Sequence, residues 1–351
     1  MKILIALTIV ILVNTQQAVA EDSHSVEAIQ AALKSPIPPQ MLQQASQFDA
    51  QVMQTHEDIN GPVTLITDAR YLRCAEIVGK LLRSINRDPS EWVVRVFDTN
   101  TKIINAYVVG GQFIYIYTGL LDDVESDDEL AFVLSHEISH SVLKHKIRRT
   151  EDTSSVVGSL IQLGGALSRN QRVKNNLELA GGAIISSYAR DDEREADALG
   201  AFIASRAGYD PSKSISFFNR MIQLEQSNNQ KLQNQIESQR QIIEKQVVNC
   251  EQLKSQWNSQ PQIRSAQNAQ TINSVCSNAA TNAQQYNSYI DNLPKSQIRF
   301  ALLRDHPVDE DRINSISMEC DFLAGRRPLE SLRNIGQGYE VLMAIDASPF
   351  K

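Results

Sequence analysis

Apolar residues recur at helical spacing in three stretches of the chain. In residues 68–85 they follow the 3.6-residue period of an amphipathic helix. Residues 127–146 form a second predicted helix, which Asp127 or Asp128 caps and which ends in basic residues that suit a helix C-terminus. Residues 188–207 form a third, ending at Gly208. We therefore predict a chain rich in helix.

Two other stretches favour strands. Residues 91–97 and 103–117 are rich in β-branched and aromatic residues, and Gly110-Gly111 divides the second stretch at a turn or bulge. Together with the helices they predict an α+β fold, mostly helical, with a small β-sheet. We expect residues 114–117 to form an edge strand, to which an extended peptide would add by main-chain hydrogen bonds.

Gln and Asn dominate residues 225–292, where aromatic residues are few and Gly is absent. Strong helix formers fill this stretch and Pro261 lies near its middle, which predicts a helical-hairpin insertion over residues 223–292. Cys250 and Cys276 lie on opposite sides of Pro261, so the hairpin would bring them together as a disulfide. The alternative is a disordered Gln-rich linker with unpaired thiols.

Residues 1–20 have the features of a secretory signal peptide. Lys2 precedes an apolar run over residues 3–13, and Ala18-Val19-Ala20 supplies a small-x-small cleavage pattern. A membrane anchor is the alternative, but the run is shorter than the ~20 residues that span a bilayer. We expect export across a membrane. The absence of an Asn-x-Ser/Thr sequon favours the bacterial periplasm over a eukaryotic secretory route.

The charge balance argues against nucleic acid as the main partner. The chain carries 34 Lys and Arg against 41 Asp and Glu, a net charge of −7, and no basic stripe. No later segment is long and apolar enough to predict a transmembrane span.

Residues 155–187 are Gly-rich and apolar. We predict that they form two short helices over the functional site, as a lid or as a surface in peripheral contact with a membrane.

The main chemical signal is His136-Glu137-Ile138-Ser139-His140, within the second predicted helix. Residues four apart lie on one face of a helix, so His136 and His140 can bind one metal ion. Imidazole nitrogens suit zinc, and a catalytic zinc site keeps one position open for water. Glu137 would take the proton of that water. A pair of core histidines with a surface Glu is the alternative.

A third ligand is required, and Glu193 and Asp197 are candidates. They are four residues apart, so their carboxylates share one helix face. Glu193 can bind the metal, while Asp197 can accept a hydrogen bond from a metal-bound imidazole. Because neighbouring residues are also acidic, the spacing alone leaves open a solvated acidic face.

Five sequence elements occur in the order in which one known family has them. They are Asn105-Ala106-Tyr107 with Gly110-Gly111 and Thr118-Gly119-Leu120-Leu121; Glu129-Leu130-Ala131 with the His136 motif; Tyr188, Arg190, Glu193, Glu195-Ala196-Asp197 and Gly200; Gly208-Tyr209-Asp210-Pro211; and His306-Pro307 with Arg312. In residues 65–222 and 295–315 the chain resembles the M48 family of zinc metallopeptidases, which are gluzincins. It is similar to the soluble exported branch, the periplasmic outer-membrane-assembly protease without its helical repeat domain.

The resemblance implies roles for four further residues. Glu193 would be the third ligand of a single zinc ion, and Asp197 its companion behind the site. His306 and Arg312 would lie at the rim and stabilise the oxyanion that forms on the peptide carbonyl. Alternatively His306 would occupy the open zinc position, or would only begin a helix before Pro307.

The resemblance also implies a zincin-like domain over residues 62–222 and 293–335, with an N-terminal helical segment at 21–61 and a C-terminal tail at 336–351. Its activity would be that of a zinc endopeptidase acting on misfolded or assembling exported proteins, by Glu137-assisted attack of zinc-bound water. Polypeptides, and outer-membrane or envelope assembly proteins, would be its partners. Two alternatives remain: a periplasmic chaperone or assembly factor with a regulatory or vestigial zinc site, and a small-molecule hydrolase.

Overall fold

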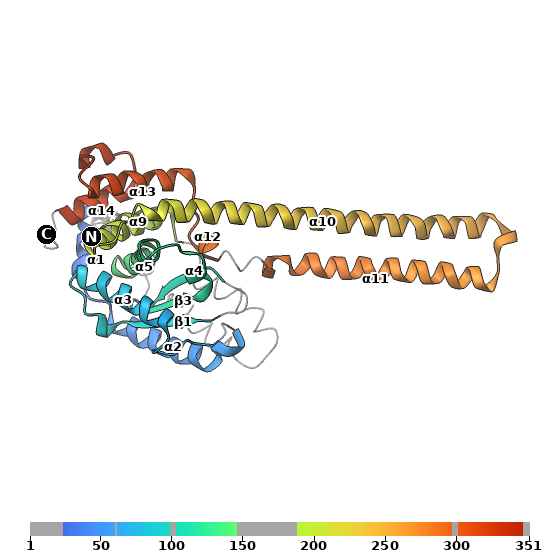
Figure 1. The fold of residues 1–351 in the computed structure, drawn as a ribbon, viewed down its shortest axis with the longest axis horizontal. Coiled ribbons are helices and arrows are strands. Elements are labelled where there is room, and N and C mark those ends of the chain that lie inside the picture. Colours follow the sequence, from blue (N-terminus) through green and yellow to red (C-terminus); the bar gives the residue numbers. More distant parts are fainter. Residues whose placement is uncertain (1–23, 60–61, 99–102, 146–187, 297–300, 347–351) are drawn as a thin grey trace, which may run out of the picture. The chain divides into compact units, whose positions relative to one another are not determined.

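The computed structural model describes residues 24–59, 62–98, 103–145, 188–296 and 301–346. They fall into two compact units (Figure 1). The core unit lies within Met1–Phe218 and Ala301–Lys351, and the hairpin unit is Asn219–Phe300. The predicted signal peptide and the predicted lid at 155–187 lie outside the described residues. None of the helices in the described residues has the length and hydrophobicity of a transmembrane span.

Three helices open the core unit. They are α1 (Val26–Lys34), α2 (Pro39–Ile59) and α3 (Ala69–Ser84). Ser25 caps α1 by accepting the Ala28 N–H, and Asp68 caps α3 by accepting the Arg70 N–H at 2.8 Å. The helix predicted over residues 68–85 is confirmed, and Ile77, Val78, Leu81 and Leu82 of the apolar period are buried, whereas Leu72 is exposed.

The sheet has three strands, β1 (Val93–Phe97), β2 (Ala106–Val109) and β3 (Phe113–Tyr117). Their order is β1-β3-β2, with β1 parallel and β2 antiparallel to β3. Gly110 and Gly111 make the turn between β2 and β3 with φ of 58° and 92°, in the left-handed region that favours glycine. The predicted turn is therefore confirmed.

The prediction that residues 114–117 form an edge strand is wrong. β3 is the central strand, because β1 returns to pair beside it in parallel. All five of its side chains are buried, as is typical of an inner strand. The edge strands are β1 and β2, and Val63 forms an isolated bridge with Phe97 of β1. Tyr117 N–H donates to the Asn105 carbonyl, so the antiparallel alternation directs the backbone groups of Ala106 and Val108 away from β3.

Helices cover both faces of the sheet (Figure 1). On one face α2 packs against an aromatic cluster of β1, β2 and β3, in which the Phe97 and Tyr115 rings stack at 5.9 Å. Asp49 links α2 to the sheet, because its carboxylate accepts two hydrogen bonds from Arg95 and one from the Tyr115 hydroxyl. On the other face lie α3 and α5, which contact β1 and β2 respectively.

The helix α5 (Asp127–Val142) packs along α9 (Arg190–Arg206) at the centre of the unit. Ser126, not Asp127 or Asp128, caps α5, and the helix ends at Val142 rather than at 146 because Lys144 turns to φ 57°. The two helices touch at Gly200, where an added Cβ would lie 3.0 Å from the backbone nitrogen of His136. This contact fixes the His136 turn of α5 against α9.

The core unit has further elements among the described residues. They are the helices α4 (Thr118–Asp123), α12 (Ala301–Asp305), α13 (Glu310–Leu323) and α14 (Gln337–Asp346), and the 3-10 turns η1 (Pro89–Glu91) and η4 (Leu329–Leu332). α14 packs on α9 and α1 through buried Val341, Leu342 and Ile345. Most of the stretch 336–351 is thus a helix of the core.

The hairpin unit contains most of α10 (Lys213–Ser259), the 3-10 turn η2 (Pro261–Ile263) and α11 (Ala266–Ser296). The predicted disulfide between Cys250 and Cys276 is confirmed, with the Cα atoms 5.0 Å apart. The other two cysteines, Cys74 and Cys320, are buried free thiols. The insertion is therefore an ordered hairpin and not a linker.

Replacing both disulfide cysteines with serine is expected to loosen the hairpin unit. The bond closes a loop of 26 residues, so its loss would remove about 3 kcal/mol of stability. Amide hydrogen exchange of α10 and α11 measures the change. Reductant should accelerate exchange in the wild type and leave the double variant unaffected; equal protection in both proteins would contradict the prediction.

Candidate metal centre

α5 presents the two histidines of the sequence motif in a buried position. Three acidic residues in its first turn stabilise the positive end of the helix dipole. Ser126 caps the helix, since its Oγ accepts the Glu129 N–H at 3.2 Å. Farther along, His136 and His140 lie one turn apart, 4% and 2% exposed, with their Nε2 atoms 2.9 Å from each other. Both rings therefore direct Nε2 to the same point.

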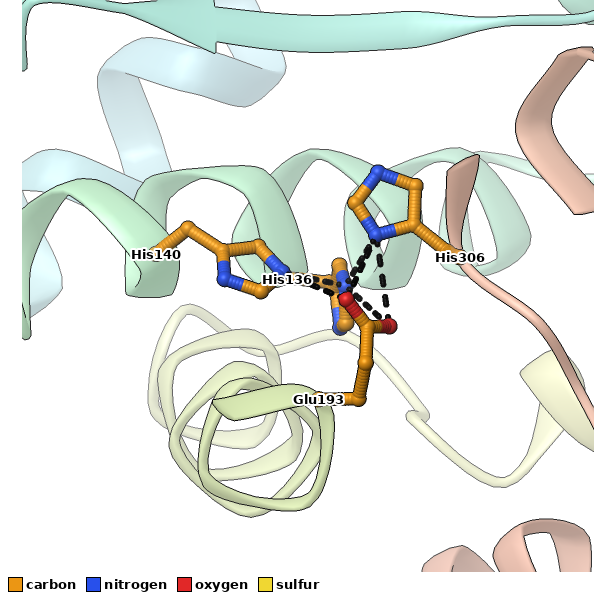
Figure 2. Close-up of side chains that lie close together, drawn as sticks. All are labelled: His136, His140, Glu193 and His306. Carbon is orange, nitrogen blue, oxygen red and sulfur yellow. Dashed lines mark hydrogen bonds and ion pairs between the residues drawn. The ribbon is translucent and has the colours of Figure 1, made fainter. Parts of the chain in front are cut away.

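Two more side chains reach this point from other elements (Figure 2). Glu193 of α9 brings its carboxylate oxygens to 3.5 Å from His136 Nε2 and 3.4 Å from His140 Nε2. His306, which follows α12, places Nδ1 3.0 Å from Glu193 Oε1 and 3.2 Å from His136 Nε2. One ligand atom from each of the four residues lies within 4.8 Å of the others. We call these four residues the ligand cluster.

The donor set of the ligand cluster fits a zinc ion. It offers imidazole nitrogens and a carboxylate, which are the ligands that zinc takes in catalytic sites. Burial, with the neighbouring His136, holds the pKa of His140 well below its usual range, so its nitrogen lone pair is free for a metal. Burial opposes ionisation of Glu193, but His306 and Arg312 hold the pKa of its carboxyl well below the usual range. Burial would lower the pKa of His136, but hydrogen bonding to Asp197 and Glu193 raises it, so a metal bound there would displace a proton from that ring.

Glu137 lies beside the ligand cluster. Its Oε1 is 3.1 Å from His306 Nε2, and its side chain is buried. Burial alone would lower the pKa of His306, but the carboxylates of Glu193 and Glu137 raise it to about 10. His306 is thus held by charge between the two carboxylates.

The carboxylate of Asp197 backs the other nitrogen of His136. Its Oδ1 lies 2.9 Å from His136 Nδ1, where a partner behind the metal would lie. Arg312 of α13 donates to both oxygens of Asp197, at 2.5 and 2.8 Å, and lies 2.7 Å from Glu193. Arg312, which we expected at the rim of the site, has a buried side chain that pairs these two carboxylates.

A cavity of about 270 Å³ opens next to Glu193. Its lining combines an aromatic ring with several charged groups: Tyr188, Arg190, Glu193, Arg194, Pro307, Asp309 and Arg312. The Tyr188 ring stacks on His140 with the centroids 3.6 Å apart. The site thus has space for a bound group on the Glu193 side.

Comparison with known proteins identifies the family. The profile of Peptidase family M48 matches residues 68–319, which is more than half of the chain. The chain belongs to this family. The match begins at α3 and runs to α13, so it includes the ligand cluster, Glu137, Asp197 and Arg312, and it continues across the hairpin unit. The family resemblance stated from the sequence motifs is confirmed.

Three matched relatives place this M48 chain among metallopeptidases. Mitochondrial metalloendopeptidase OMA1 of Saccharomyces cerevisiae is 28% identical over 167 residues, covering 45% of this chain and 48% of the relative. Putative beta-barrel assembly-enhancing protease of Vibrio cholerae is 32% identical over 129 residues, covering 34% and 26%. Metalloprotease YcaL of Escherichia coli is 27% identical over 156 residues, covering 44% and 59%. The chain spans less than two thirds of the length of each.

The sequence analysis assigned no role to two residues behind His140, His145 and Glu195. His145 Nδ1 lies 2.7 Å from His140 Nδ1, and Glu195 lies 2.9 Å behind His145. His145 is five residues after His140, a spacing that a continued helix would place on another face. The helix ends before it, and that change of direction brings His145 back. The sequence offered one signal for His145: it is one of only six histidines in the chain.

Proposed function

We propose that this M48 chain is a zinc-dependent endopeptidase of the bacterial periplasm that hydrolyses peptide bonds in misfolded or assembling exported proteins. The observation that carries the proposal is the convergence of His136, His140 and Glu193 beside Glu137. Relatives named as metalloendopeptidases support the reaction. A relative named as a beta-barrel assembly-enhancing protease supports the substrate class.

We assign His136, His140 and Glu193 as the protein ligands of one zinc ion per chain. Zinc held there would supply a Lewis acid and lower the pKa of water at the site. Asp197 orients the His136 ring through Nδ1, and Arg312 holds the Asp197 and Glu193 carboxylates in place by charge. We therefore treat Arg312 as a positioning residue.

Glu137 is the general base in this proposal. Its carboxylate accepts a proton from the attacking water and passes it to the amine nitrogen of the leaving peptide. His306 Nε2 at 3.1 Å holds Oε1 of that carboxylate. The buried position of Glu137 keeps bulk water from competing for the proton.

His306 keeps both of the roles inferred from the family. Its Nδ1 lies among the ligand atoms, which supports a fourth-ligand role. Its charge between Glu193 and Glu137 supports a role as donor to the oxyanion. The position of the ring in crystal structures of the free and inhibitor-bound protein would separate the two.

The substrate would lie along β2. The backbone groups of Ala106 and Val108 are directed away from β3, and α5 contacts this strand. An extended peptide paired with β2 would gain main-chain hydrogen bonds close to the metal helix. A peptide of several residues can pair with more of the backbone N–H and C=O groups of β2 than a small molecule can, which favours a peptide substrate.

Metal removal tests the proposed activity. Purified protein is expected to contain one zinc per chain by elemental analysis and to cleave casein or another unfolded protein. A chelator should abolish cleavage, and added zinc should restore it, because the side chains of the ligand cluster are electron donors and the proposed Lewis acid is the zinc itself. Full cleavage by protein shown to be free of zinc would contradict the proposal.

The hairpin unit favours a second candidate, a chaperone or assembly factor with a regulatory zinc site. A groove of about 740 Å³ between α10 and α11 is lined by amide side chains and by Ile242, Ile243, Tyr286 and Tyr289. Ile242 and Tyr289 are 46% and 44% exposed, so the groove offers apolar contact to a partner. Complementation by Glu137→Gln but not by a deletion of residues 225–292 would favour this candidate over the peptidase.

A further inference from the structure

A row of hydrogen-bonded side chains extends from the back of His140 to the start of α1. His140 Nδ1 lies 2.7 Å from His145 Nδ1, and His145 Nε2 lies 2.9 Å from Glu195 Oε2. The other carboxylate oxygen of Glu195 lies 2.7 Å from His24 Nδ1. Four residues from three parts of the sequence thus form one continuous row, which we call the His140 row.

The inner members of the row are fully buried. His145 and Glu195 are both 0% exposed, while the His24 side chain at the outer end is 20% exposed. Glu195 comes two positions after Glu193 on α9, so the helix directs it to a different side from the ligand cluster. A buried carboxylate is costly unless hydrogen bonds compensate it, and here two imidazoles do so.

The geometry allows one consistent direction for the protons. Nε2 of His140 points into the ligand cluster, so the ring proton sits on Nδ1, which donates to Nδ1 of His145. His145 then carries its own proton on Nε2 and donates it to Glu195. His24 donates from Nδ1 to the remaining oxygen of the same carboxylate.

We infer that His145 and Glu195 are positioning residues that fix the tautomer and orientation of His140 toward the metal. The inference rests on the proposed zinc site. His136 has a carboxylate directly behind it, in Asp197, whereas His140 reaches its carboxylate through a second imidazole. Such outer partners raise the basicity of a metal-binding histidine and hold its ring. Tyr188 fixes the plane of the same ring by stacking.

A purely structural role predicts something different. If Glu195 only filled space, the isosteric Glu195→Gln would leave metal binding unchanged. If it orients His140 through His145, loss of the negative charge weakens the row at its anchor. The same comparison applies at His145, where Asn keeps an acceptor near the position of Nδ1 and Leu does not.

The experiment measures metal binding by the full chain, not only activity. Zinc affinity is determined by competition with a chromophoric chelator, and the site geometry by the absorption spectrum of the cobalt-substituted protein. We expect Glu195→Gln and His145→Leu to weaken zinc binding about 10- to 100-fold and to alter the cobalt spectrum. His145→Asn should recover part of the affinity.

Leu143→Ala is the matched control, because Leu143 is also 0% exposed and lies two residues before His145. It should lower the melting temperature and leave zinc affinity at the wild-type value. Wild-type affinity and spectrum in both Glu195→Gln and His145→Leu would overturn the inference. So would an equal loss in Leu143→Ala, since the loss would then follow stability.

Two further results, a variant that does not fold and a wild type without peptidase activity, also have a defined interpretation. Should His145→Leu fail to fold, as judged by circular dichroism, the isosteric Glu195→Gln alone decides the inference. A wild type that binds one zinc but cleaves no polypeptide would defeat the proposed peptidase function, while the affinities of the variants would still decide the role of the His140 row.

Discussion

The Glu137→Gln variant is expected to lose proteolysis by about 10²- to 10⁴-fold in kcat, the usual contribution of a general base. Gln has the shape of Glu but cannot accept and return a proton at neutral pH. Zinc content should stay at the wild-type level, because His136, His140 and Glu193 are unchanged. Steady-state cleavage of casein or a fluorogenic peptide, together with elemental analysis, measures both quantities.

Glu129→Gln is a suitable control on the same helix. Glu129 is also buried, but its Oε2 accepts the backbone N–H of Glu125 at the start of α5, far along the helix from the motif. Gln retains an acceptor there, so this variant should cleave normally. Wild-type turnover in Glu137→Gln would refute the general-base role, and loss of its zinc would instead make Glu137 a ligand.

The Arg312→Met variant is expected to lower the free energy of unfolding by about 3–5 kcal/mol, since removing one partner of a buried ion pair leaves uncompensated charge. Arg312 pairs with both Asp197 and Glu193, which are 1% and 3% exposed. Without it, Glu193 loses a cation that keeps its carboxyl ionised, so zinc content should fall too. Denaturant unfolding and elemental analysis measure the two effects.

Arg326→Met gives the comparison for a surface arginine. Arg326 pairs with Asp321, and the two side chains are 60% and 37% exposed, so the loss should be within about 1 kcal/mol. The Arg312 result also separates two roles. An oxyanion donor at the rim would lose turnover while keeping stability and zinc, and that outcome would reinstate the role expected from the sequence.

Features that depend on local spacing follow from the amino-acid sequence alone. His136 and His140 lie one helical turn apart, so their convergence followed from the period of the helix. The turn at Gly110-Gly111 needs residues that tolerate positive φ, and the pairing of Cys250 with Cys276 followed from a hairpin centred on Pro261. The M48 resemblance added Glu193, because spacing alone could not distinguish a ligand from a solvated acid.

The contacts between distant elements became known from the fold alone. Strand order depends on how the chain returns to the sheet, which alternation of apolar residues does not encode, so β3 lies at the centre between β1 and β2. Arg312 is buried because α13 packs against α9. His145 meets Glu195 because α5 stops at Val142 and the backbone reverses at Lys144. Local patterns fix periodicity within one element, whereas long-range packing sets the contacts between elements.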